Sequence, residues 1–543
     1  MDAITSTPAP RNEPVRSYAP RSHERQSLIR TLAELSAQRS ELTMTIGGAQ
    51  RMAAGQPFNV VAPHRHAHVL GTSAQATPAD VSDAVRVATQ TAPAWRELPF
   101  DERAAILLRA ADLAAGSWRD TLNAATMLGQ SKSVQQAEID AACELIDFWR
   151  FNVHYARHIL EQQPSSVPGE WNRMDYRPLD GFVTAITPFN FTAIAANLPT
   201  APALMGNTVV WKPTPTQQLS AHYTMRLLEA AGLPPGVINL VTGDGAAVSQ
   251  VALADPDFAG LHFTGSTTTF KKLWRIITDH LDSYRSYPRI VGETGGKNYL
   301  VAHPSANPAE VTTALVRGAF EYQGQKCSAV SRAYLARSLW DSGLREQLLD
   351  TTRTISYGDV ADLTYFGGAV IDARAFAKHR DLLARVATDP SIEVLAGGGC
   401  DDTQGWFVQP TVLLTGDPKH EVFTTEYFGP ILAVHVYPDG DYPAILDLID
   451  STGPYALTGA VFATDRQAIG QALQTLRFAA GNFYVNDKPT GAIVGRQPFG
   501  GSRASGTNDK AGSLFNLLRW TSPRAIKEAF DPPTDHIYPH MIG

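Results

Sequence analysis

The stretch GFVTAITPFNFTAIAANLPTAPALMGNTVVW, residues 181–211, contains no charged residue and decides the fold class. Phe182–Thr187 and Thr208–Lys212 are short apolar runs of the kind that form buried strands, and Ala193–Met205 between them reads as a buried helix. Three prolines and three asparagines within the stretch argue against a membrane span, because lipid does not satisfy such residues. The stretch therefore predicts a strand, a helix and a second strand inside a folded core.

The alternation of apolar strands and helices continues on both sides of this stretch. The expected elements are helices within Pro78–Ala115, Gln135–Leu160 and Ser220–Ala231, and strands at Val237–Val241 and Leu261–Thr264. Strands separated by helices predict an α/β fold, in which helices cover both faces of a parallel sheet. A second α/β series runs from about Gly295 to Asp487, whereas the polar stretch Pro164–Pro178 is expected to leave the core.

Length and composition indicate a globular protein with more than one domain. The 543 residues are too many for one ordinary core, and the hydrophobic (44%) and charged (18%) fractions are those of folded proteins. The net charge is −7, from 46 basic and 53 acidic residues, and no basic stripe is present. This charge pattern argues against a nucleic-acid partner.

The N-terminus and the cysteines bear on the compartment. The first thirty residues combine five arginines with three acidic residues and lack an apolar core, so they do not resemble a secretory signal. The first twenty, rich in Ser, Pro and Arg, are expected to be mobile. Three cysteines, Cys143, Cys327 and Cys400, lack metal-ligand spacing and suit a reducing compartment. We therefore expect a cytoplasmic protein without a membrane span or a metal.

Two short motifs carry candidate chemistry. Glu293-Thr-Gly-Gly-Lys297 is a carboxylate followed by a glycine pair, and Gly324-Gln-Lys-Cys-Ser328 places Cys327 34 residues after Glu293. Glycines let the backbone pass close to a ligand, a thiolate can act as a nucleophile, and a carboxylate can act as a base. An isolated buried Cys or Glu is usually structural, so each motif alone leaves a structural role open.

Five motifs taken together resemble the aldehyde dehydrogenase superfamily. The other three are TPFNF at 187–191, FTGS at 263–266 and EYFGP at 426–430, and the resemblance extends from about Phe58 to the C-terminus. It implies an α/β fold with a Rossmann-type cofactor domain, an α/β catalytic domain and a small oligomerisation hairpin. The expected organisation is an N-terminal extension (1–44), an NAD-binding domain (45–158 and 181–294), a catalytic domain (295–487), and bridging or oligomerisation segments with a substrate anchor loop (159–180 and 488–543).

The resemblance implies that an aldehyde is oxidised through a thioester on Cys327, which needs a depressed pKa or a nearby base. The side-chain amide of Asn190 and the N–H of Cys327 would donate to the oxyanion, and losing one such donor typically costs ~10²–10³ in rate. Glu293 would activate the water that hydrolyses the thioester. A turn role for Asn190 and a surface position for Glu293 are the structural alternatives.

The resemblance also implies NAD as cofactor. Lys212 would hydrogen-bond the adenosine ribose, Ser266 at a helix start would meet the pyrophosphate, and Glu426 would hold the nicotinamide ribose with Phe428 beside it. The remaining expected cofactor contacts are Thr187, Pro188, Phe189 and Gly295. A solvated Lys212 and a plain helix cap at Ser266 are the structural alternatives. Pro215 stands where NAD-preferring members often carry a glutamate, which leaves NADP use open on charge grounds.

Further motifs are similar to those of the L-glutamate-γ-semialdehyde dehydrogenase family, which acts in proline breakdown. They are TGA at 490–492, GRQPFGG at 495–501 and ASGTN at 504–508. The resemblance implies that Lys326, Ser328 and the N–H groups of Gly491 and Ala492 bind the substrate's α-carboxylate. Phe191 and Phe499 would pack on its methylene chain, and Glu144 is expected to pair with Lys326.

Rival interpretations are an aldehyde dehydrogenase for another semialdehyde or an aliphatic aldehyde, acyl transfer to coenzyme A, and a non-catalytic protein on the same fold. Three candidate catalytic residues argue against the last, and Glu293 favours hydrolysis. The expected partners are a small-molecule substrate and a second copy of the chain, as a homodimer or higher homo-oligomer, with a functional link to proline dehydrogenase. His64, His66 and His68 are read as an exposed strand or turn rather than a metal site, and Cys143 and Cys400 as unreactive thiols.

Overall fold

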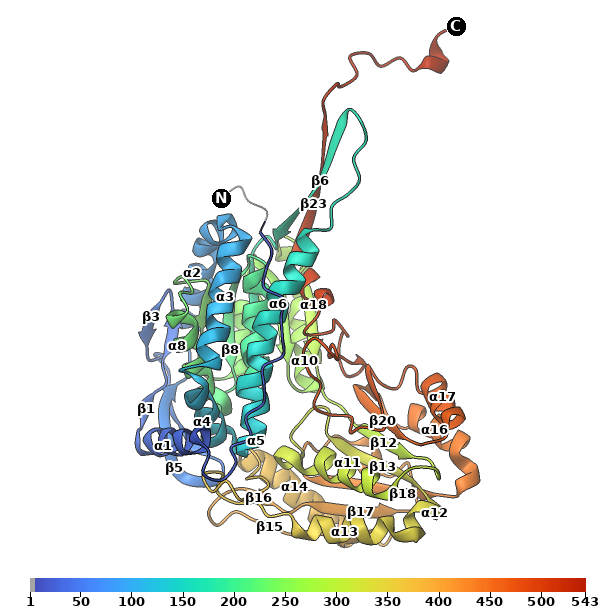
Figure 1. Cartoon of the computed structure of the whole chain (residues 1–543). Coiled ribbons are helices and arrows are strands. Elements are labelled where there is room, and N and C mark those ends of the chain that lie inside the picture. Colours follow the sequence, from blue (N-terminus) through green and yellow to red (C-terminus); the bar gives the residue numbers. More distant parts are fainter. Residues whose placement is uncertain (1–4) are drawn as a thin grey trace.

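The computed structural model describes residues 5–543 and contains two seven-stranded sheets. Figure 1 shows the sheets in two lobes, one above the other, with a two-stranded ribbon projecting from the upper lobe and the C-terminus beyond it. The strands of the first sheet lie between Met44 and Glu293, and those of the second between Asn298 and Val485.

The first sheet has the order β11-β10-β7-β8-β9-β2-β3, and its first five strands are parallel. Its strands are β2 (Met44–Ile46), β3 (Ala49–Arg51), β7 (Phe182–Thr187), β8 (Thr208–Pro213), β9 (Ile238–Leu240), β10 (Phe258–Thr264) and β11 (Arg289–Glu293). One face packs on α3 (Phe100–Ala115), α6 (Leu145–Leu160), α7 (Thr192–Leu204) and α8 (Gln218–Ala230). The other packs on α2 (Pro78–Glu97), α9 (Gly245–Ala252) and α10 (Thr267–Asp279).

The predicted strand–helix–strand unit is confirmed as β7, α7 and β8. Both strands are buried along their whole length, and β7 pairs in parallel with β8 from Phe182 to Thr187. Burial on both faces explains the absence of charge in this stretch, because a charged side chain there would lose its water without gaining a partner.

The second sheet has the order β14-β17-β18-β13-β12-β20-β21, with only β14 antiparallel to its neighbour. Its strands are β12 (Asn298–Ala302), β13 (Val330–Ala336), β14 (Ile392–Ala396), β17 (Thr411–Thr415), β18 (Ile431–Tyr437), β20 (Thr458–Phe462) and β21 (Asn482–Val485). The principal helices around it are α11 (Pro308–Phe320), α13 (Arg345–Thr354), α14 (Ala373–Val386), α16 (Tyr442–Ser451) and α17 (Arg466–Thr475). The predicted second α/β series is therefore this sheet.

The expected helix over 135–160 is interrupted. After the short α5 (Val134–Ala137), a π-helical segment, η1, covers Glu138–Glu144 before α6 begins. The i→i+5 bonds of a π segment insert one extra residue per turn, and such segments often occur at functional sites. Here the segment ends at Glu144, a candidate site residue.

The prediction of a mobile N-terminus is wrong for residues 5–20, while residues 1–4 lie outside the described part of the chain. The Asn12 side chain and the Glu13 N–H donate to the Asp147 carboxylate at 2.8 and 2.7 Å. Tyr18 is buried and donates to Glu138 at 2.9 Å. These residues precede α1 (His23–Ala37) and a small sheet of β1 (Ser40–Glu41), β4 (Pro57–Ala62) and β5 (Arg65–Ala74).

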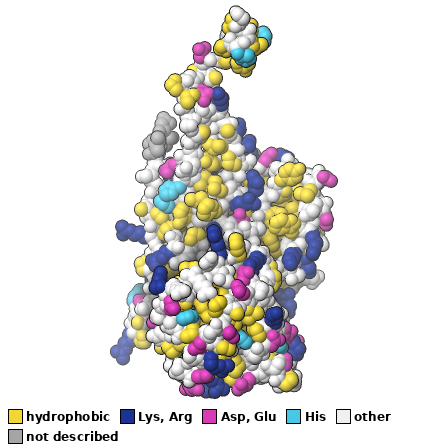
Figure 2. All heavy atoms as spheres, turned by 90° about the vertical axis from the view of Figure 1, so that its right-hand side faces the viewer, with side chains coloured by type: hydrophobic (Ala, Val, Ile, Leu, Met, Phe, Trp, Pro, Cys, Tyr) yellow, Lys and Arg dark blue, Asp and Glu magenta, His cyan; other side chains and the backbone are white. Residues whose placement is uncertain are grey.

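The predicted hairpin is a ribbon made from two distant segments. β6 (Glu170–Pro178) pairs antiparallel with β23 (Thr521–Ala529) over nine residues, so the C-terminal segment completes what residues 159–180 begin. Trp171 is 51% exposed and Phe530, just beyond β23, is 64% exposed. Figure 2 shows hydrophobic side chains along this projection and at its tip.

The three alternating histidines and the lengths of the helices bear on metal binding and on membrane insertion. His64 is buried and its Nδ1 lies 3.1 Å from the Ser131 hydroxyl, whereas His66 and His68 bond backbone carbonyls. Within residues 5–543, no cluster of His, Cys, Asp and Glu is placed to hold a metal ion. None of the described helices combines the length and the apolar character that a membrane crossing requires.

Candidate active site

Cys327 lies in a loop that joins α11 to β13. Tyr322, Gln323 and Gly324 are all left-handed, with φ of 50°, 53° and 65°. Asn298, at the start of β12, donates from its side chain to the Cys327 carbonyl at 2.7 Å and to the Ala329 carbonyl at 2.9 Å. Asn298 thus ties the backbone of this loop, at Cys327 and Ala329, to the second sheet.

The glycine pair after Glu293 packs under this loop. A Cβ at Gly296 would lie 2.5 Å from the Cys327 carbonyl oxygen, far inside van der Waals contact. A glycine at position 296 therefore allows the segment after β11 to pass close to the backbone of Cys327, as the motif predicts.

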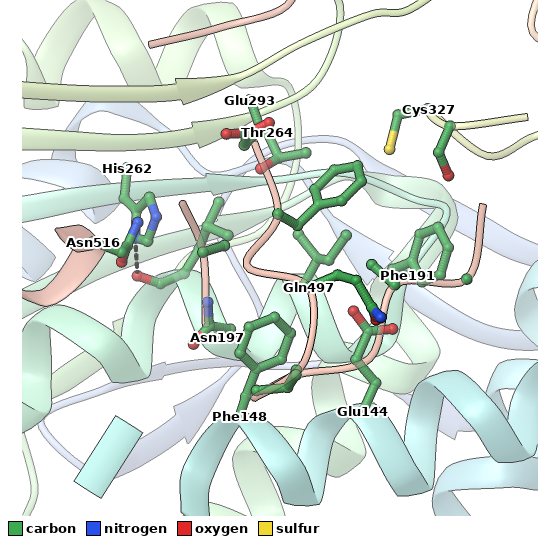
Figure 3. Close-up of a pocket in the computed structure, with 18 residues that line it drawn as sticks. Glu144, Phe148, Phe191, Asn197, His262, Thr264, Glu293, Cys327, Gln497 and Asn516 are labelled. Atoms are coloured by element: carbon green, nitrogen blue, oxygen red, sulfur yellow. Dashed lines mark hydrogen bonds between the residues drawn. The ribbon is translucent and has the colours of Figure 1, made fainter. Parts of the chain in front are cut away.

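Cys327 and Glu293 line the same pocket, which has about 810 Å³ of empty space including its mouth. Figure 3 shows these two residues on one side and Glu144 and Phe148, from the helix, on the other. Six of the predicted substrate and catalytic residues join them there: Glu144, Phe191, Ser328, Gly491, Ala492 and Phe499. Residues from both sheets and from the C-terminal segment thus meet in one cavity.

Ten lining residues were not predicted: Phe148, Ile194, Asn197, Leu198, His262, Thr264, Val494, Gln497, Ala511 and Asn516. Half of them are apolar, and the polar ones stand outside the motifs or carry side chains with no evident chemical role in the sequence. His262, for example, bonds the Leu198 carbonyl through Nδ1 at 2.9 Å, and burial lowers its pKa to about 3. Gln497 stands inside the GRQPFGG motif, which could have pointed to it.

The Cys327 thiol is not activated by a depressed pKa. Burial, reinforced by the nearby Glu293, Glu426 and Glu144 carboxylates, raises its pKa to about 12. Of the two predicted ways to form a thiolate, this site therefore requires the second, a base that takes the proton.

Glu293 is a carboxyl group in the same pocket that could serve as such a base. Burial raises its pKa well above the ordinary value, Lys510 and the Gly501 N–H oppose the rise, and Asp509 adds to it. Its Oε2 has no hydrogen-bond partner within residues 5–543. An acceptor without a partner and with raised basicity can take a proton from a thiol or a water.

Asn190 lies between β7 and α7 and reaches the loop that carries Cys327. Its Nδ2 donates to the Gln325 carbonyl at 3.1 Å, two residues before Cys327. A side-chain amide has two N–H groups, so one is left for an oxyanion beside the thiol. Asp140, in the π segment, caps the start of α7 by accepting from the N–H groups of Thr192 and Ala193 at 2.9 and 2.8 Å.

One end of the pocket offers donors to an anion. The Ser328 and Thr490 hydroxyls lie 2.7 Å apart, and Gly491 follows with φ of +87°. The left-handed glycine forms a turn whose N–H groups can face a common centre. Ser328, Gly491 and Ala492 all line the cavity, as predicted.

The prediction for Lys326 is wrong in its contacts. Its Nζ pairs with Glu321 at 3.0 Å rather than with Glu144, and the side chain lines a second, smaller pocket that contains Glu426. Lys326–Ala329 form a turn, closed by the Ala329 N–H to the Lys326 carbonyl at 3.0 Å, in which Cys327 and Ser328 line the first pocket and Lys326 lines the second. Glu144 remains in the first pocket, where burial and Asp140 raise its pKa to about 8.

The predicted nicotinamide-ribose residues lie together. Glu426 accepts from the Gly296 N–H at 2.8 Å, and a Cβ at Gly295 would lie 2.2 Å from its other oxygen. Phe428 is left-handed, with φ of +61°, and its ring packs edge to face with Phe189 at 5.7 Å between centroids.

The remaining predicted cofactor residues lie along the carboxyl ends of β7, β8 and β10. The Thr187 hydroxyl accepts from the Trp211 indole at 3.1 Å, and Pro188 follows it in the chain. Lys212 is buried, and burial lowers its pKa to about 8. Its Nζ has no hydrogen-bond acceptor in the described chain. Ser266 caps α10 and is exposed, so the start of this helix is open to an anion.

Comparison with known proteins places this geometry in a family. The aldehyde dehydrogenase family model matches residues 51–526. Delta-1-pyrroline-5-carboxylate dehydrogenase of Agaricus bisporus is 49% identical over 99% of each chain, and the human mitochondrial enzyme of that name is 45% identical over 98% of this chain and 94% of its own. The crystal structure of the Mycobacterium tuberculosis enzyme bound with NAD is 64% identical, with a TM-score of 0.97 over the whole of both chains. The chain belongs to the aldehyde dehydrogenase family.

Proposed function

We propose that this chain oxidises L-glutamate γ-semialdehyde, which forms from Δ1-pyrroline-5-carboxylate, to L-glutamate in the second step of proline breakdown. The observation that carries the proposal is a single pocket that holds the Cys327 thiol, the Glu293 carboxyl and the anion-binding turn at Ser328, Gly491 and Ala492. The names and full-length similarity of the relatives support the same activity.

The first half of the reaction forms a covalent bond between Cys327 and the aldehyde. Glu293 accepts the thiol proton, the sulfur attacks the carbonyl carbon, and negative charge develops on the aldehyde oxygen. The second N–H of the Asn190 amide and the N–H of Cys327 donate to that oxygen. Asn298 holds the Cys327 carbonyl during this step, so the peptide group that follows Cys327 keeps its orientation.

NAD is the proposed cofactor and, when bound, accepts the hydride. The residues present fit it: Lys212 is a buried ammonium without an acceptor in the described chain, Ser266 opens a helix start, and only a glycine at 295 leaves Glu426 its place. Lys212 would hold the adenosine ribose and Glu426 the nicotinamide ribose, with Phe428 beside it. Thr187, Pro188 and Phe189 would complete the cofactor-binding surface. Pro215 adds no charge against a 2′-phosphate, so NADP is the cofactor to compare.

The second half hydrolyses the thioester on Cys327. Glu293 first releases the thiol proton to solvent and then removes a proton from water. The oxygen adds to the acyl carbon, and the Cys327 sulfur leaves and regains a proton while the carboxylic acid product ionises. An enzyme that passed the acyl group to coenzyme A would have no water to activate in this second half, so a carboxyl group in the pocket favours water as acceptor.

A panel of aldehydes tests the substrate. We expect kcat/KM for glutamate-γ-semialdehyde to exceed that for pentanal by about 10- to 10³-fold with saturating NAD, because the carboxylate gains charge-assisted hydrogen bonds. Succinate semialdehyde and NADP are run in parallel. Equal values for glutamate-γ-semialdehyde and pentanal would overturn the substrate and leave the thioester chemistry standing.

The organisation of the chain is proposed on the same basis. Residues 45–158 and 181–294 bind the cofactor, 295–487 carry the nucleophile, and 159–180 with 488–543 bridge to a second copy while supplying the anchor loop. The exposed aromatic residues on the ribbon support a homodimer or higher homo-oligomer. A functional link to proline dehydrogenase follows from the substrate, which that enzyme's reaction supplies. Three free thiols support a reducing, cytoplasmic compartment, although the human relative is named as mitochondrial, and cell fractionation tests this.

A further inference from the structure

The turn that precedes the nucleophile has an unusual backbone. Tyr322 and Gln323 have φ of 50° and 53° with ψ of 38° and 33°, and Gly324 follows with φ of +65°. The left-handed conformation is unfavourable for a residue with a Cβ and is rare in succession. Something outside the turn must therefore hold it in this shape.

The Gln323 side chain is fully buried and reaches two separate segments. Its Nε2 donates to the Ser131 carbonyl at 3.0 Å and to the Ala369 carbonyl at 2.7 Å, which uses both of its hydrogens. Ser131 follows α4 (Arg119–Gln130), which packs against α8 on the side of the first sheet, and Ala369 lies in the loop between α13 and α14, next to Val370 of the core around the second sheet. One amide thus joins both lobes to the turn.

The surroundings of this amide are closely packed and depend on two glycines. A Cβ at Gly367 would lie 2.6 Å from Gln323 Oε1, and a Cβ at Gly368 would lie 2.2 Å from the Ser131 hydroxyl. That hydroxyl accepts from the Ala369 N–H at 2.8 Å, so Ser131 and Ala369 also bind each other directly.

The loop that contains Ala369 also holds Gln325, two residues before Cys327. The Ile371 N–H donates to Gln325 Oε1 at 2.9 Å, and the Gln325 carbonyl accepts from Asn190. A shift at position 323 is therefore transmitted through Gln325 both to Cys327 and to the proposed oxyanion donor.

We propose that Gln323 is a positioning residue that holds the left-handed turn and thereby aligns the Cys327 thiol with the Asn190 amide. Without its two hydrogen bonds, two buried carbonyls lose their donor and the turn relaxes toward right-handed geometry. The inference rests on the proposed role of Cys327 as nucleophile.

The test compares Gln323→Met with Ser131→Ala in the full-length chain. Gln323→Met keeps the length of the side chain and removes its donors. Ser131→Ala removes the hydroxyl bonds to Ala369 and His64 at the same junction but keeps the Ser131 carbonyl that Gln323 binds. Two rates are measured: NADH formation in a single turnover with glutamate-γ-semialdehyde, and alkylation of Cys327 by iodoacetamide without substrate, followed on the Cys327 peptide by mass spectrometry.

We expect Gln323→Met to slow the single turnover by about 10- to 100-fold, because small misplacements of reacting groups have effects of this size. Alkylation of Cys327 should become faster, since the thiol leaves its buried position, and the Kd of NAD should stay within about twofold. Ser131→Ala should retain most of both wild-type rates. Gln323→Glu, which preserves shape and can donate one bond when protonated, should fall between wild type and Gln323→Met and replaces Gln323→Met if that variant does not fold.

Wild-type rates in both Gln323 variants, or an equal loss in Ser131→Ala, would overturn the inference. A wild-type protein that fails to oxidise glutamate-γ-semialdehyde would instead contradict the proposed function. The alkylation comparison needs no substrate and would still decide the role of Gln323.

Discussion

Gly295 and Glu426 fit together only because position 295 has no side chain. A Cβ there would lie 2.2 Å from Oε2 of Glu426, while Oε1 accepts the Gly296 N–H at 2.8 Å. The glycine pair thus serves two partners: Gly295 admits the proposed ribose-binding carboxylate, and Gly296 admits the carbonyl of the nucleophile.

Gly295→Ala should therefore weaken cofactor binding. The new methyl group displaces the Glu426 carboxylate, and we expect the KM for NAD to rise by about tenfold or more, as for the loss of a charge-assisted hydrogen bond. Steady-state kinetics with varied NAD measure this. Gly416→Ala is the matched control, because a Cβ at Gly416 meets nothing within 4 Å and should leave the KM unchanged. An unchanged KM in Gly295→Ala would remove Glu426 from the cofactor site.

The raised pKa of Cys327, about 12, predicts a pH dependence. Below that pKa the thiolate fraction rises tenfold for each pH unit, so alkylation of the free protein by iodoacetamide should quicken by about that factor per unit between pH 6 and 9. A plateau within this range would mean a depressed pKa instead. Cys327→Ala supplies the control: it should lose both the labelled peptide and all turnover, while its thermal melting stays close to wild type.

Glu293→Gln should separate the two halves of the reaction. The variant lacks the base for the thiol and the base for water. We expect a first turnover of NADH that is slower than in the wild type and stops at one thioester per site, followed by a still slower steady state. Stopped-flow absorbance at 340 nm records this first turnover. Because burial raises the pKa of Glu293, wild-type hydrolysis should also decline as the pH falls through that raised pKa and the carboxylate gains a proton. A first turnover at the wild-type rate would show that Glu293 does not take the thiol proton, and a wild-type steady state would remove it from hydrolysis.

Gly491→Val should affect the substrate's far end alone. A β-branched residue is strained at φ of +87°, so the turn that offers its N–H groups to a carboxylate must shift. We expect the KM for glutamate-γ-semialdehyde to rise at least tenfold, with a much smaller change for propanal. Propanal on the same variant is the internal control, and equal changes for both aldehydes would mean that the turn does not read the carboxylate.

Charging the ribbon tests its proposed role between copies. Trp171 and Phe530 are 51% and 64% exposed on the ribbon, so replacing both by Glu should cost a subunit contact its apolar area. Light scattering after gel filtration should then give the 58.8 kDa mass of one chain instead of an oligomer's. An unchanged mass would place the subunit contact elsewhere.

Much of the fold could be predicted because it depends on local patterns. The β7–α7–β8 unit follows from runs of apolar residues broken by prolines, and its observed bounds differ from the predicted ones by a single residue at most. The π segment at Glu138–Glu144 could not be predicted, because its extra residue leaves no visible break in the spacing of the apolar residues. It is fixed by partners far away, among them Arg119 and the start of α7.

The site divides in the same way. Cys327, Glu293 and the residues around them stand in motifs whose chemistry is visible in their side chains. The predicted substrate contact of Lys326 rests on its charge and its place beside Cys327. The direction of its side chain depends instead on backbone geometry and on the ion pair with Glu321, five residues earlier. A role for Gln323 could not be predicted, because an amide in a loop has no evident function until its two carbonyl partners, 192 and 46 residues away, are known.

The ribbon also has a consequence for synthesis of the chain. β6 is made about 340 residues before β23, so at ~5–20 residues per second its edge waits roughly 20–70 s on the ribosome without its partner. An unpaired strand edge is a template for aggregation. Release of a chain that stops short of Thr521 leaves this edge permanently open, so only a chain that includes Thr521–Ala529 can close it.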